Sequence, residues 1–189
     1  MCIRDSFKGV NDLVFDALGN MCFTDQGLTG MHDPTGRVFR LSPDGAQLDC
    51  LVDTVPSPNG LVPNLSEDIL YLAVTRANQV WRVPLLDDGG TAKVGIFLHL
   101  SGGGGGPDGM ALDAEGGLLV CHAGNGCVWH FDAMGEPKHR IRSCTGLVTT
   151  NLAFGGPDNK SLFITESHSG AILKADLPVS GKTMYSHMD

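Results

Sequence analysis

Three polar side chains recur along the chain at nearly constant spacing: Asn11, Asn59 and Asp108 lie 48 and 49 residues apart. Their carboxylate and carboxamide oxygens are hard ligands of the kind that Ca²⁺, Mg²⁺ or Mn²⁺ prefers. If the fold brings the three positions together, they form a site for one divalent cation. The same residues also suit a purely structural role, because Asn-Asp, Asn-Gly and Asp-Gly pairs favour tight turns. Spacing alone leaves both interpretations open, and Asp12 is either a partner of the site or a turn carboxylate.

This spacing arises from an internal repeat. Four segments share a polar residue, an apolar stretch, a turn and a second apolar stretch, and they begin at Asn11, Asn59, Asp108 and Asn151. A period of about 40–50 residues built from short strands is typical of β-propeller blades. In a propeller the innermost strand of each blade lines the central channel. Equivalent positions of successive blades are therefore expected to converge on the axis.

The elements that would position these residues are short strands. Apolar runs flank turn-forming sequences in three pairs: 37–41 with 47–52, 80–84 with 94–98, and 118–121 with 128–131. No extended stretch free of Gly and Pro has apolar residues at helical spacing. We therefore predict an all-β fold, a β-propeller with about four blades present. Residues 7–189 form one propeller portion, whereas residues 1–6 match neither the repeat nor a secretory leader and are expected to be a non-native junction.

Composition excludes several classes of protein. The 189 residues include 42% hydrophobic and 18% charged residues, and the formal net charge is −8. An acidic chain does not suit binding to nucleic acid, and no apolar window is long enough to cross a membrane. The six cysteines include no C-x-x-C pair, and a Cys121–Cys127 disulfide is less favoured than two buried thiols. With no leader present we expect a cytoplasmic protein, although a missing N-terminus leaves export open, and the sequence gives no oligomeric state.

Other candidate groups have a structural interpretation beside the functional one. His122 ends a predicted strand, where it either reaches the mouth of the channel to contact substrate or is a partly exposed strand-end residue. His130 and His139 alternate with apolar neighbours and are expected to face solvent. Glu166 lines the channel or belongs to a loop, and the loop is favoured. The glycine run Gly102–Gly106 precedes a strand, not a helix, so we expect a loop between blades in place of a phosphate cradle.

Five short motifs together resemble one family. They are Val10-Asn11-Asp12, Phe23-Thr24-Asp25, Pro58-Asn59-Gly60, Gly106-Pro107-Asp108-Gly109 and the segment from Asn151 to Pro157. Their order and spacing are similar to those of the gluconolactonase/regucalcin (senescence marker protein) family, and the similarity runs from about Phe7 to the C-terminus. The resemblance implies the last four blades of a six-bladed propeller, and hence an incomplete ring.

The same resemblance implies the roles of individual residues. Asn59 would be a metal ligand, Asp108 a metal ligand and the general base, and Asn11 a contact to substrate or to metal-bound water, and so part of the metal site. The cation expected is Ca²⁺, with Zn²⁺, Mn²⁺ or Mg²⁺ as alternatives. The family has a further ligand, a Glu of its first blade, which has no counterpart in this chain. An Arg that some animal members carry two residues before the Asn is Gly9 here.

We therefore predict a hydrolase that acts on cyclic esters, a metal-dependent lactonase for a sugar or aliphatic lactone, present as a four-blade portion. The absent Glu ligand allows that this portion is inactive by itself. Two alternatives stay open: a non-catalytic propeller that serves as a binding platform, and an enzyme similar to arylesterases or strictosidine synthase.

Overall fold

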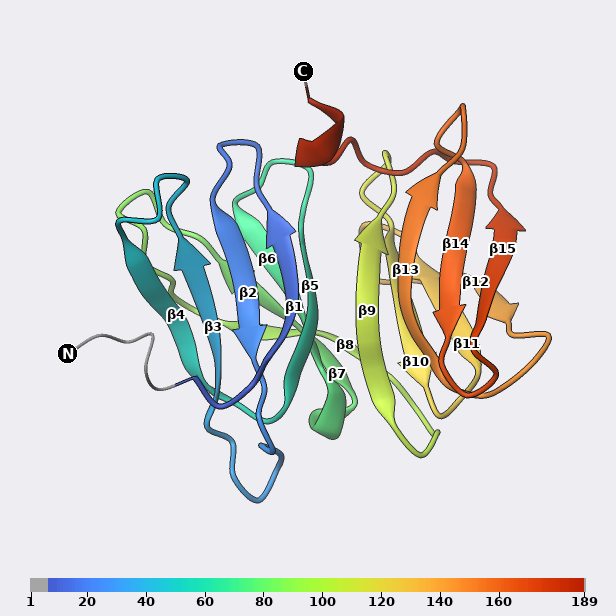
Figure 1. Ribbon diagram of the computed structural model, residues 1–189, viewed down its shortest axis with the longest axis horizontal. Helices are drawn as coiled ribbons and strands as arrows, with labels where there is room; N and C mark the ends of the chain where they lie inside the picture. Colours follow the sequence, from blue (N-terminus) through green and yellow to red (C-terminus); the bar gives the residue numbers. More distant parts are fainter. Residues whose placement is uncertain (1–6, 189) are drawn as a thin grey trace.

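The computed structural model describes residues 7–188 and contains four antiparallel sheets (Figure 1). The first sheet has the strand order β1 (Val10–Phe15), β2 (Met21–Asp25), β3 (Gly36–Leu41) and β4 (Leu48–Val55). The second has β5 (Pro58–Pro63), β6 (Ile69–Val74), β7 (Gln79–Pro84) and β8 (Gly95–His99). The third has β9 (Gly106–Leu112), β10 (Leu118–Ala123), β11 (Cys127–Phe131) and β12 (Pro137–Arg142). The last has β13 (Thr149–Gly155), β14 (Ser161–Glu166) and β15 (Ala171–Asp176).

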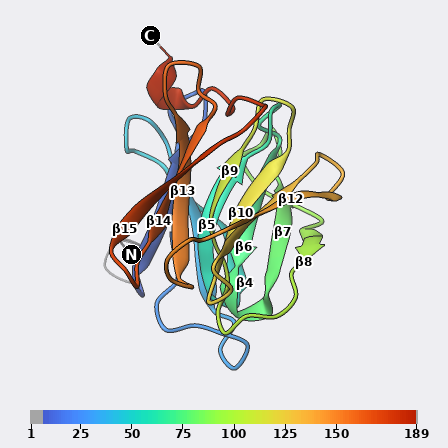
Figure 2. The same ribbon diagram turned by 90° about the vertical axis from the view of Figure 1, so that its right-hand side faces the viewer.

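These sheets are the blades of a propeller, as predicted. The first strands of successive sheets pack against one another in the order β1, β5, β9, β13. The arrows of β1, β9 and β13 point toward the same end of the molecule in Figure 1. Figure 2 shows β8 and β12 on the outside, away from these inner strands. Residues near the N-terminal ends of the inner strands therefore share one end of the axis.

The core lies between the sheets and explains the apolar runs of the sequence. On β10, Leu118 and Val120 pack toward the second sheet, whereas Leu119 and Cys121 pack toward the fourth. A strand covered on both faces has no polar alternation, and so it is a continuous apolar run. Burying each such side chain contributes about 1.5–3 kcal/mol. Cys121 and Cys127 are both buried and free, which confirms the prediction of two thiols.

The third sheet is covered on both faces, and this contradicts the prediction made for His130. His130 was expected to face solvent, but it lies on the covered face of the third sheet with no exposed surface. Its Nε2 lies 2.8 Å from Oδ2 of Asp113, a carboxylate that is also fully buried. Alternation along a strand separates its two faces but does not tell which face a neighbouring sheet covers.

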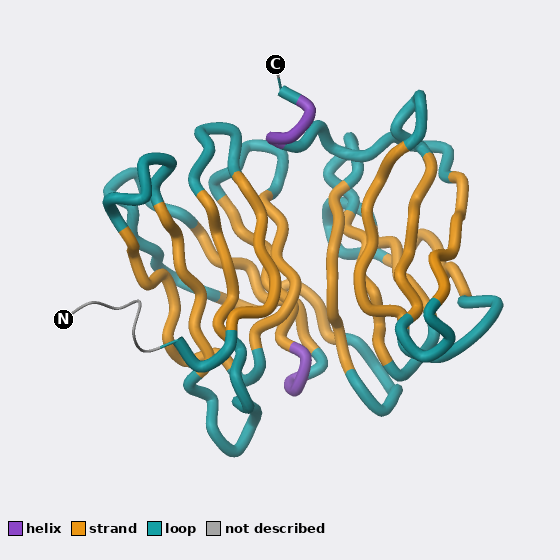
Figure 3. Tube along the Cα trace, in the orientation of Figure 1, coloured by secondary structure: helices purple, strands orange, loops and turns teal. Residues whose placement is uncertain are grey.

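The C-terminal segment ties the last sheet to the first two at one end of the axis. The Lys182 ammonium donates to the carbonyl oxygen of Asn64 (2.9 Å) and to Oε1 of Glu67 (2.7 Å). The Tyr185 ring stacks on Phe15 with centroids 5.6 Å apart. Tyr185 belongs to the short helix η3 (Tyr185–His187), whereas η2 (Thr75–Ala77) lies at the opposite end of the sheets (Figure 3). In residues 7–188, no helix is both long and apolar enough to cross a membrane.

Glu166 fixes the turn after β14, which agrees with the loop role favoured from the sequence. Its carboxylate accepts hydrogen bonds from the backbone N–H groups of Val148 (2.9 Å) and Ser169 (2.8 Å) and from the Ser169 hydroxyl. The Ser169 hydroxyl, followed by these amides, lowers the pKa of Glu166 to about 2. Because the charged form is favoured in the folded state, it contributes stability above the unfolded pKa of about 4.5 and loses it as pH falls toward 2.

We accordingly predict that the midpoint of urea unfolding falls between pH 5 and pH 2 more steeply in the parent than in Glu166→Gln. The variant lacks the group that must be protonated, so its curve should be flatter over this window. The exposed Glu136→Gln is the matched control and should follow the parent. Identical slopes in Glu166→Gln and the parent would show that the Glu166 hydrogen bonds do not stabilise the charged form.

Candidate functional site

Each inner strand carries a β-bulge at the same place, where two of its residues oppose one residue of the next strand. In β1 the pairing skips from Val10 to Leu13, and the corresponding shifts follow Pro58 in β5, Pro107 in β9 and Thr149 in β13. The first bulge residue is in turn Asn11, Asn59, Asp108 and Thr150. Bulges redirect side chains and are common beside active sites. The predicted site residues therefore hold equivalent positions in the first three blades.

The pairing register of β13 with β14 shows that the leading position of the fourth repeat lies one residue earlier than predicted. Asn151, expected at the leading position, is the second bulge residue, and Thr150 is the first. Asn151 is thus equivalent to Asp12. The Oδ1 of each accepts the N–H of the following residue at 2.8 Å, and the backbone N–H of each donates to a threonine hydroxyl, Thr24 or Thr165. These bonds satisfy the backbone of the bulge, which is a structural role.

Glycine at the second bulge position lets neighbouring inner strands approach closely. A Cβ on Gly60 would lie 2.3 Å from the carbonyl oxygen of Asp108, and one on Gly109 would lie 2.2 Å from Oδ1 of Asn151. Both glycines lie inside strands β5 and β9. The Asn-Gly and Asp-Gly pairs therefore do not form the tight turns that were the alternative from sequence. They are places where one backbone packs on the next.

Asn59 is held in place by a link between the second and third blades. It is buried, and its Nδ2 donates to the Thr75 hydroxyl at 3.2 Å. Thr75 donates in turn to the carbonyl oxygen of Pro107 at 2.8 Å, one residue before Asp108. This chain of bonds fixes the amide orientation. The end of the amide that carries the oxygen is the one not used by Thr75.

Asp108 is a carboxyl in an electrostatically unfavourable place. Its pKa is raised to about 7, mainly by burial and next by the nearby charge of Asp12, although a hydrogen bond from the Asn59 side chain lowers it. Burial likewise raises the pKa of Asp12. Two acidic groups beside amide oxygens need either protons or a cation. The donor set therefore fits a hard divalent cation.

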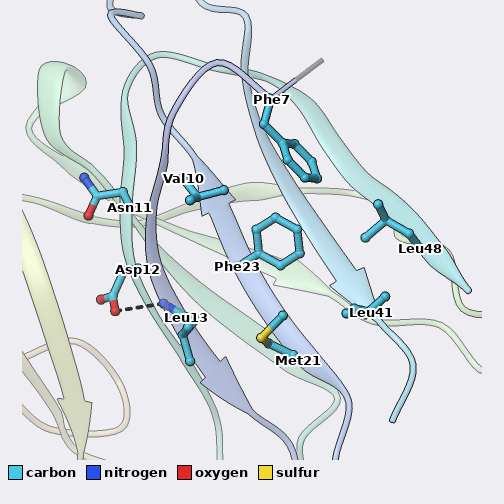
Figure 4. Close-up of a pocket in the computed structure, with 9 residues that line it drawn as sticks. All are labelled: Phe7, Val10, Asn11, Asp12, Leu13, Met21, Phe23, Leu41 and Leu48. Atoms are coloured by element: carbon cyan, nitrogen blue, oxygen red, sulfur yellow. Dashed lines mark hydrogen bonds between the residues drawn. The ribbon is translucent and has the colours of Figure 1, made fainter. Parts of the chain in front are cut away.

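Asn11 lies at the edge of this group and is exposed. Its Nδ2 donates to Oε1 of Gln26 at 2.7 Å. Figure 4 shows Asn11 and Asp12 directed away from the apolar side chains of the first sheet. The structure thus brings Asn59 and Asp108 into contact, adds Asp12 through its charge, and joins Asn11 to Gln26. Gln26 and Thr75 carried no signal in the sequence, because their roles depend on contacts between blades.

The ligands of a cation here would be mainly amide oxygens. Within the described residues, His, Cys, Asp and Glu side chains form no group of three or more that could hold a metal ion. The apolar cavity of about 400 Å³ in Figure 4 is no alternative site. Its walls are mainly hydrophobic side chains such as Leu13 and Phe23, which cannot bind a cation or polarise a carbonyl. It is instead the uncovered face of the first sheet, where Leu13 remains 53% exposed.

His122 is not the partly exposed strand-end residue that was one of its two interpretations from sequence. It is fully buried, and its Nδ1 accepts a hydrogen bond from the Trp129 indole at 3.2 Å. Its Nε2 has no hydrogen-bond partner in the described chain and lies against Gly103, where a Cβ would be 3.1 Å away. Burial lowers the pKa of His122, which favours the neutral ring. A contact with substrate would require the glycine loop to move, so this role stays a prediction.

A cavity of about 210 Å³ lies on the axis and is lined by all four inner strands together with Lys182 and Met184. These two residues belong to the C-terminal segment, at the end opposite the bulges. Asp12 and Asn151, the second bulge residues of the first and fourth blades, also line it. The cavity therefore reaches from the level of the bulges toward the C-terminal segment.

Comparison with known proteins identifies a family and several relatives. A family model described as the SMP-30/gluconolactonase/LRE-like region matches residues 4–168. The lactonase drp35 of Staphylococcus aureus (strain USA300) is 31% identical over 135 residues, which are 70% of this chain and 41% of that protein. The lactonase drp35 of Staphylococcus haemolyticus is 33% identical over the same length.

Two solved structures extend the similarity to the fold. Regucalcin from Agrobacterium tumefaciens, described as a calcium-binding protein, superposes with a TM-score of 0.79 at 25% identity, over 93% of this chain and 63% of that one. A gluconolactonase from Xanthomonas campestris gives a TM-score of 0.76 at 25% identity, over 91% and 58%. The chain spans 41% of the length of the curated relatives it matches.

We predict that Gly60→Ala destabilises the protein by about 1–3 kcal/mol, because the added methyl group overlaps backbone atoms that cannot rotate away. It should also weaken cation binding, since Asn59 and Asp108 belong to the two strands that the methyl group would push apart. Gly104→Ala is the control, because a Cβ there meets nothing within 4 Å. Chemical denaturation and Tb³⁺ luminescence titration measure the two effects. Equal stability of both variants would contradict the close approach of β5 and β9.

Proposed function

This chain belongs to the SMP-30/gluconolactonase/LRE-like family, and on that premise we propose that it hydrolyses a lactone at the bulge site, with a divalent cation held by Asn59, Asp108 and Asn11. One observation carries the proposal. A carboxyl that burial and Asp12 bring to a pKa of about 7 lies beside a buried, oriented amide where the inner strands begin. The lactonase and gluconolactonase relatives support the reaction class.

Asp108 acts as the general base. A water molecule attacks the lactone carbonyl carbon, and its proton passes to Asp108. The ring C–O bond then breaks, and Asp108 returns the proton to the leaving ring oxygen, which gives a hydroxy acid and restores the carboxylate. A cation bound at this site supplies polarisation of the carbonyl and a lower pKa for bound water.

The neighbouring amides orient the reacting groups. The Thr75 hydroxyl fixes Asn59, and Gln26 fixes the amino end of Asn11, so that both amides have a defined direction. Because these side chains are already oriented, no entropy is lost in ordering them when the substrate binds. Such orientation lowers the activation barrier by several kcal/mol in favourable cases. The carboxylate of Asp12 places negative charge near Asp108, and this charge favours a bound cation.

Ca²⁺ is the cation we propose first, because all the ligands are oxygens and the regucalcin relative is described as calcium-binding. Zn²⁺, Mn²⁺ and Mg²⁺ are the alternatives to test. The family resemblance implies one further Glu ligand, and no residue of this chain matches it. We therefore expect weak binding, with a Kd on the order of 10⁻⁴–10⁻³ M.

The decisive variant is Asp108→Asn, which keeps the shape of the side chain but loses its charge and basicity. We predict a fall in lactone hydrolysis of at least ~100-fold, because general base catalysis typically contributes about 10²–10⁴-fold. A pH-indicator assay on aldonolactones and aliphatic lactones, at millimolar Ca²⁺, Mn²⁺, Mg²⁺ or Zn²⁺ and with chelator, measures it. Asp53→Asn, on the exposed surface, is the control.

Two results would count against the proposal. Full activity in Asp108→Asn, or in the chelated parent, would remove the carboxylate or the cation from the reaction. A parent that binds no cation by calorimetry and hydrolyses none of the lactones would favour a non-catalytic propeller. Cation binding without hydrolysis would support the site but show that these four blades are insufficient for the reaction.

A further inference from the structure

A second cavity opens at the same end of the molecule as the bulge site. Its volume is about 710 Å³, and it lies between the loop that connects β2 to β3 and the start of the second blade. The polar side chains that line it are Gln26, Thr29, His32, Ser57 and Arg76, and within residues 7–188 no acidic residue lines it. This volume is in the range of sites for small molecules and exceeds the need of a simple lactone ring.

Hydrogen bonds join this cavity to the bulge site. Asn11 donates to Oε1 of Gln26 at 2.7 Å, and Nε2 of Gln26 donates to the Ser57 hydroxyl at 2.8 Å. On the other side, Arg76 directly follows Thr75, whose hydroxyl accepts from Asn59. One wall of the cavity is therefore built from residues that also position the amides of the site.

The cavity wall is fixed in place. Ser57 is buried and has a φ of 64°, a left-handed conformation that a non-glycine residue seldom adopts. Its backbone N–H donates to the Thr29 hydroxyl at 3.2 Å, and its carbonyl oxygen accepts from the N–H of Thr75 at 3.1 Å. Such conformations persist only where the surroundings enforce them, and they are common at ligand sites.

Arg76 is the cationic group of this cavity. Its aliphatic stem and the His32 ring both flank Gly30, where a Cβ would lie 3.6 Å from Cγ of Arg76 and 3.2 Å from Nδ1 of His32. The guanidinium is exposed and forms no ion pair with any residue that the structure describes. The whole chain carries a net charge of −8, so this cavity is a local exception in charge.

We propose that this cavity binds a carboxylate carried by the lactone substrate, with Arg76 as the residue that determines this specificity. The inference rests on the proposed function: the lactone ring would lie at Asn59 and Asp108, and its substituent would extend past Gln26 to Arg76. A guanidinium presents paired donors that match a carboxylate in two parallel hydrogen bonds. The substrate class is thus an anionic lactone.

Binding without turnover is the first test. The probe is tetrahydrofuran-2-carboxylate, a ring that cannot be hydrolysed, and its neutral partner is tetrahydrofuran-2-carboxamide. Calorimetry is done in chelator, so that the carboxylate has no cation to bind. We expect the parent to prefer the carboxylate by about 10–100-fold, the range for a charge-assisted hydrogen bond. Arg76→Met should abolish this preference, and Arg76→Lys should retain part of it.

Controls separate this site from general charge effects. Arg82→Met removes an exposed arginine from the same blade, away from the cavity, and should keep the full preference. Thermal unfolding of Arg76→Met should match the parent, because the guanidinium has no partner to lose. Equal affinity of the parent for the two probes, or an unchanged preference in Arg76→Met, would overturn the proposal.

Turnover distinguishes the failure of this inference from that of the proposed function. With cation present, we expect the parent to hydrolyse 5-oxotetrahydrofuran-2-carboxylate with a lower KM than γ-butyrolactone, and Arg76→Met to remove the difference while leaving γ-butyrolactone unchanged. Hydrolysis of both lactones with equal KM in the parent would overturn the carboxylate site and retain the lactonase. A carboxylate preference in binding with no hydrolysis of either lactone would retain the carboxylate site and count against lactone hydrolysis by these four blades.

Discussion

The structure depends on how closely the inner strands of neighbouring blades approach at their bulges. At Gly60 and Gly109 the next strand lies so near that even a methyl group would overlap its atoms. This contact fixes the order of the blades and the height of each strand along the axis. In the second and third blades the glycine is the second residue of the bulge, and the residue before it, Asn59 or Asp108, holds the equivalent position in each. The two bulge positions therefore have separate roles. The glycine at the second position allows the strands to approach, and the first residue, Asn59 or Asp108, lies where the two blades meet.

An electrostatic consequence follows from this packing. Close approach leaves Asp108 only partly exposed, and burial is the largest cause of its raised pKa. The protein relieves little of this cost with its own groups, since the Asn59 hydrogen bond lowers the pKa but Asp12 raises it. A carboxyl of this kind is unfavourable for stability alone. It is favourable as a site that accepts a proton or a cation, which is the property that the proposed reaction requires.

Much of the fold was predictable because the repeat is visible in the sequence, and the repeat also indicated Asn59 and Asp108. The bulge was not predictable, because Asn-Gly is equally suited to a turn and to a close backbone contact. For the same reason the register of the fourth blade was one residue wrong, and Thr150 takes the place expected for Asn151. The burial of His130 could not be foreseen, since it depends on which sheet covers that face. Arg76 and Gln26 gave no signal, because loops far apart in the sequence bring them together.

Stability and chemistry are placed at opposite ends of the axis. At one end Lys182 and Tyr185 tie the last sheet to the first two, and the buried ammonium has three acceptors. At the other end lie the bulge site and the cavity of Arg76, joined by Gln26. The strands that hold Asn59 and Asp108 are therefore braced at the end away from these loops. Loops positioned by a rigid scaffold commonly carry binding residues, which is the role proposed for Arg76.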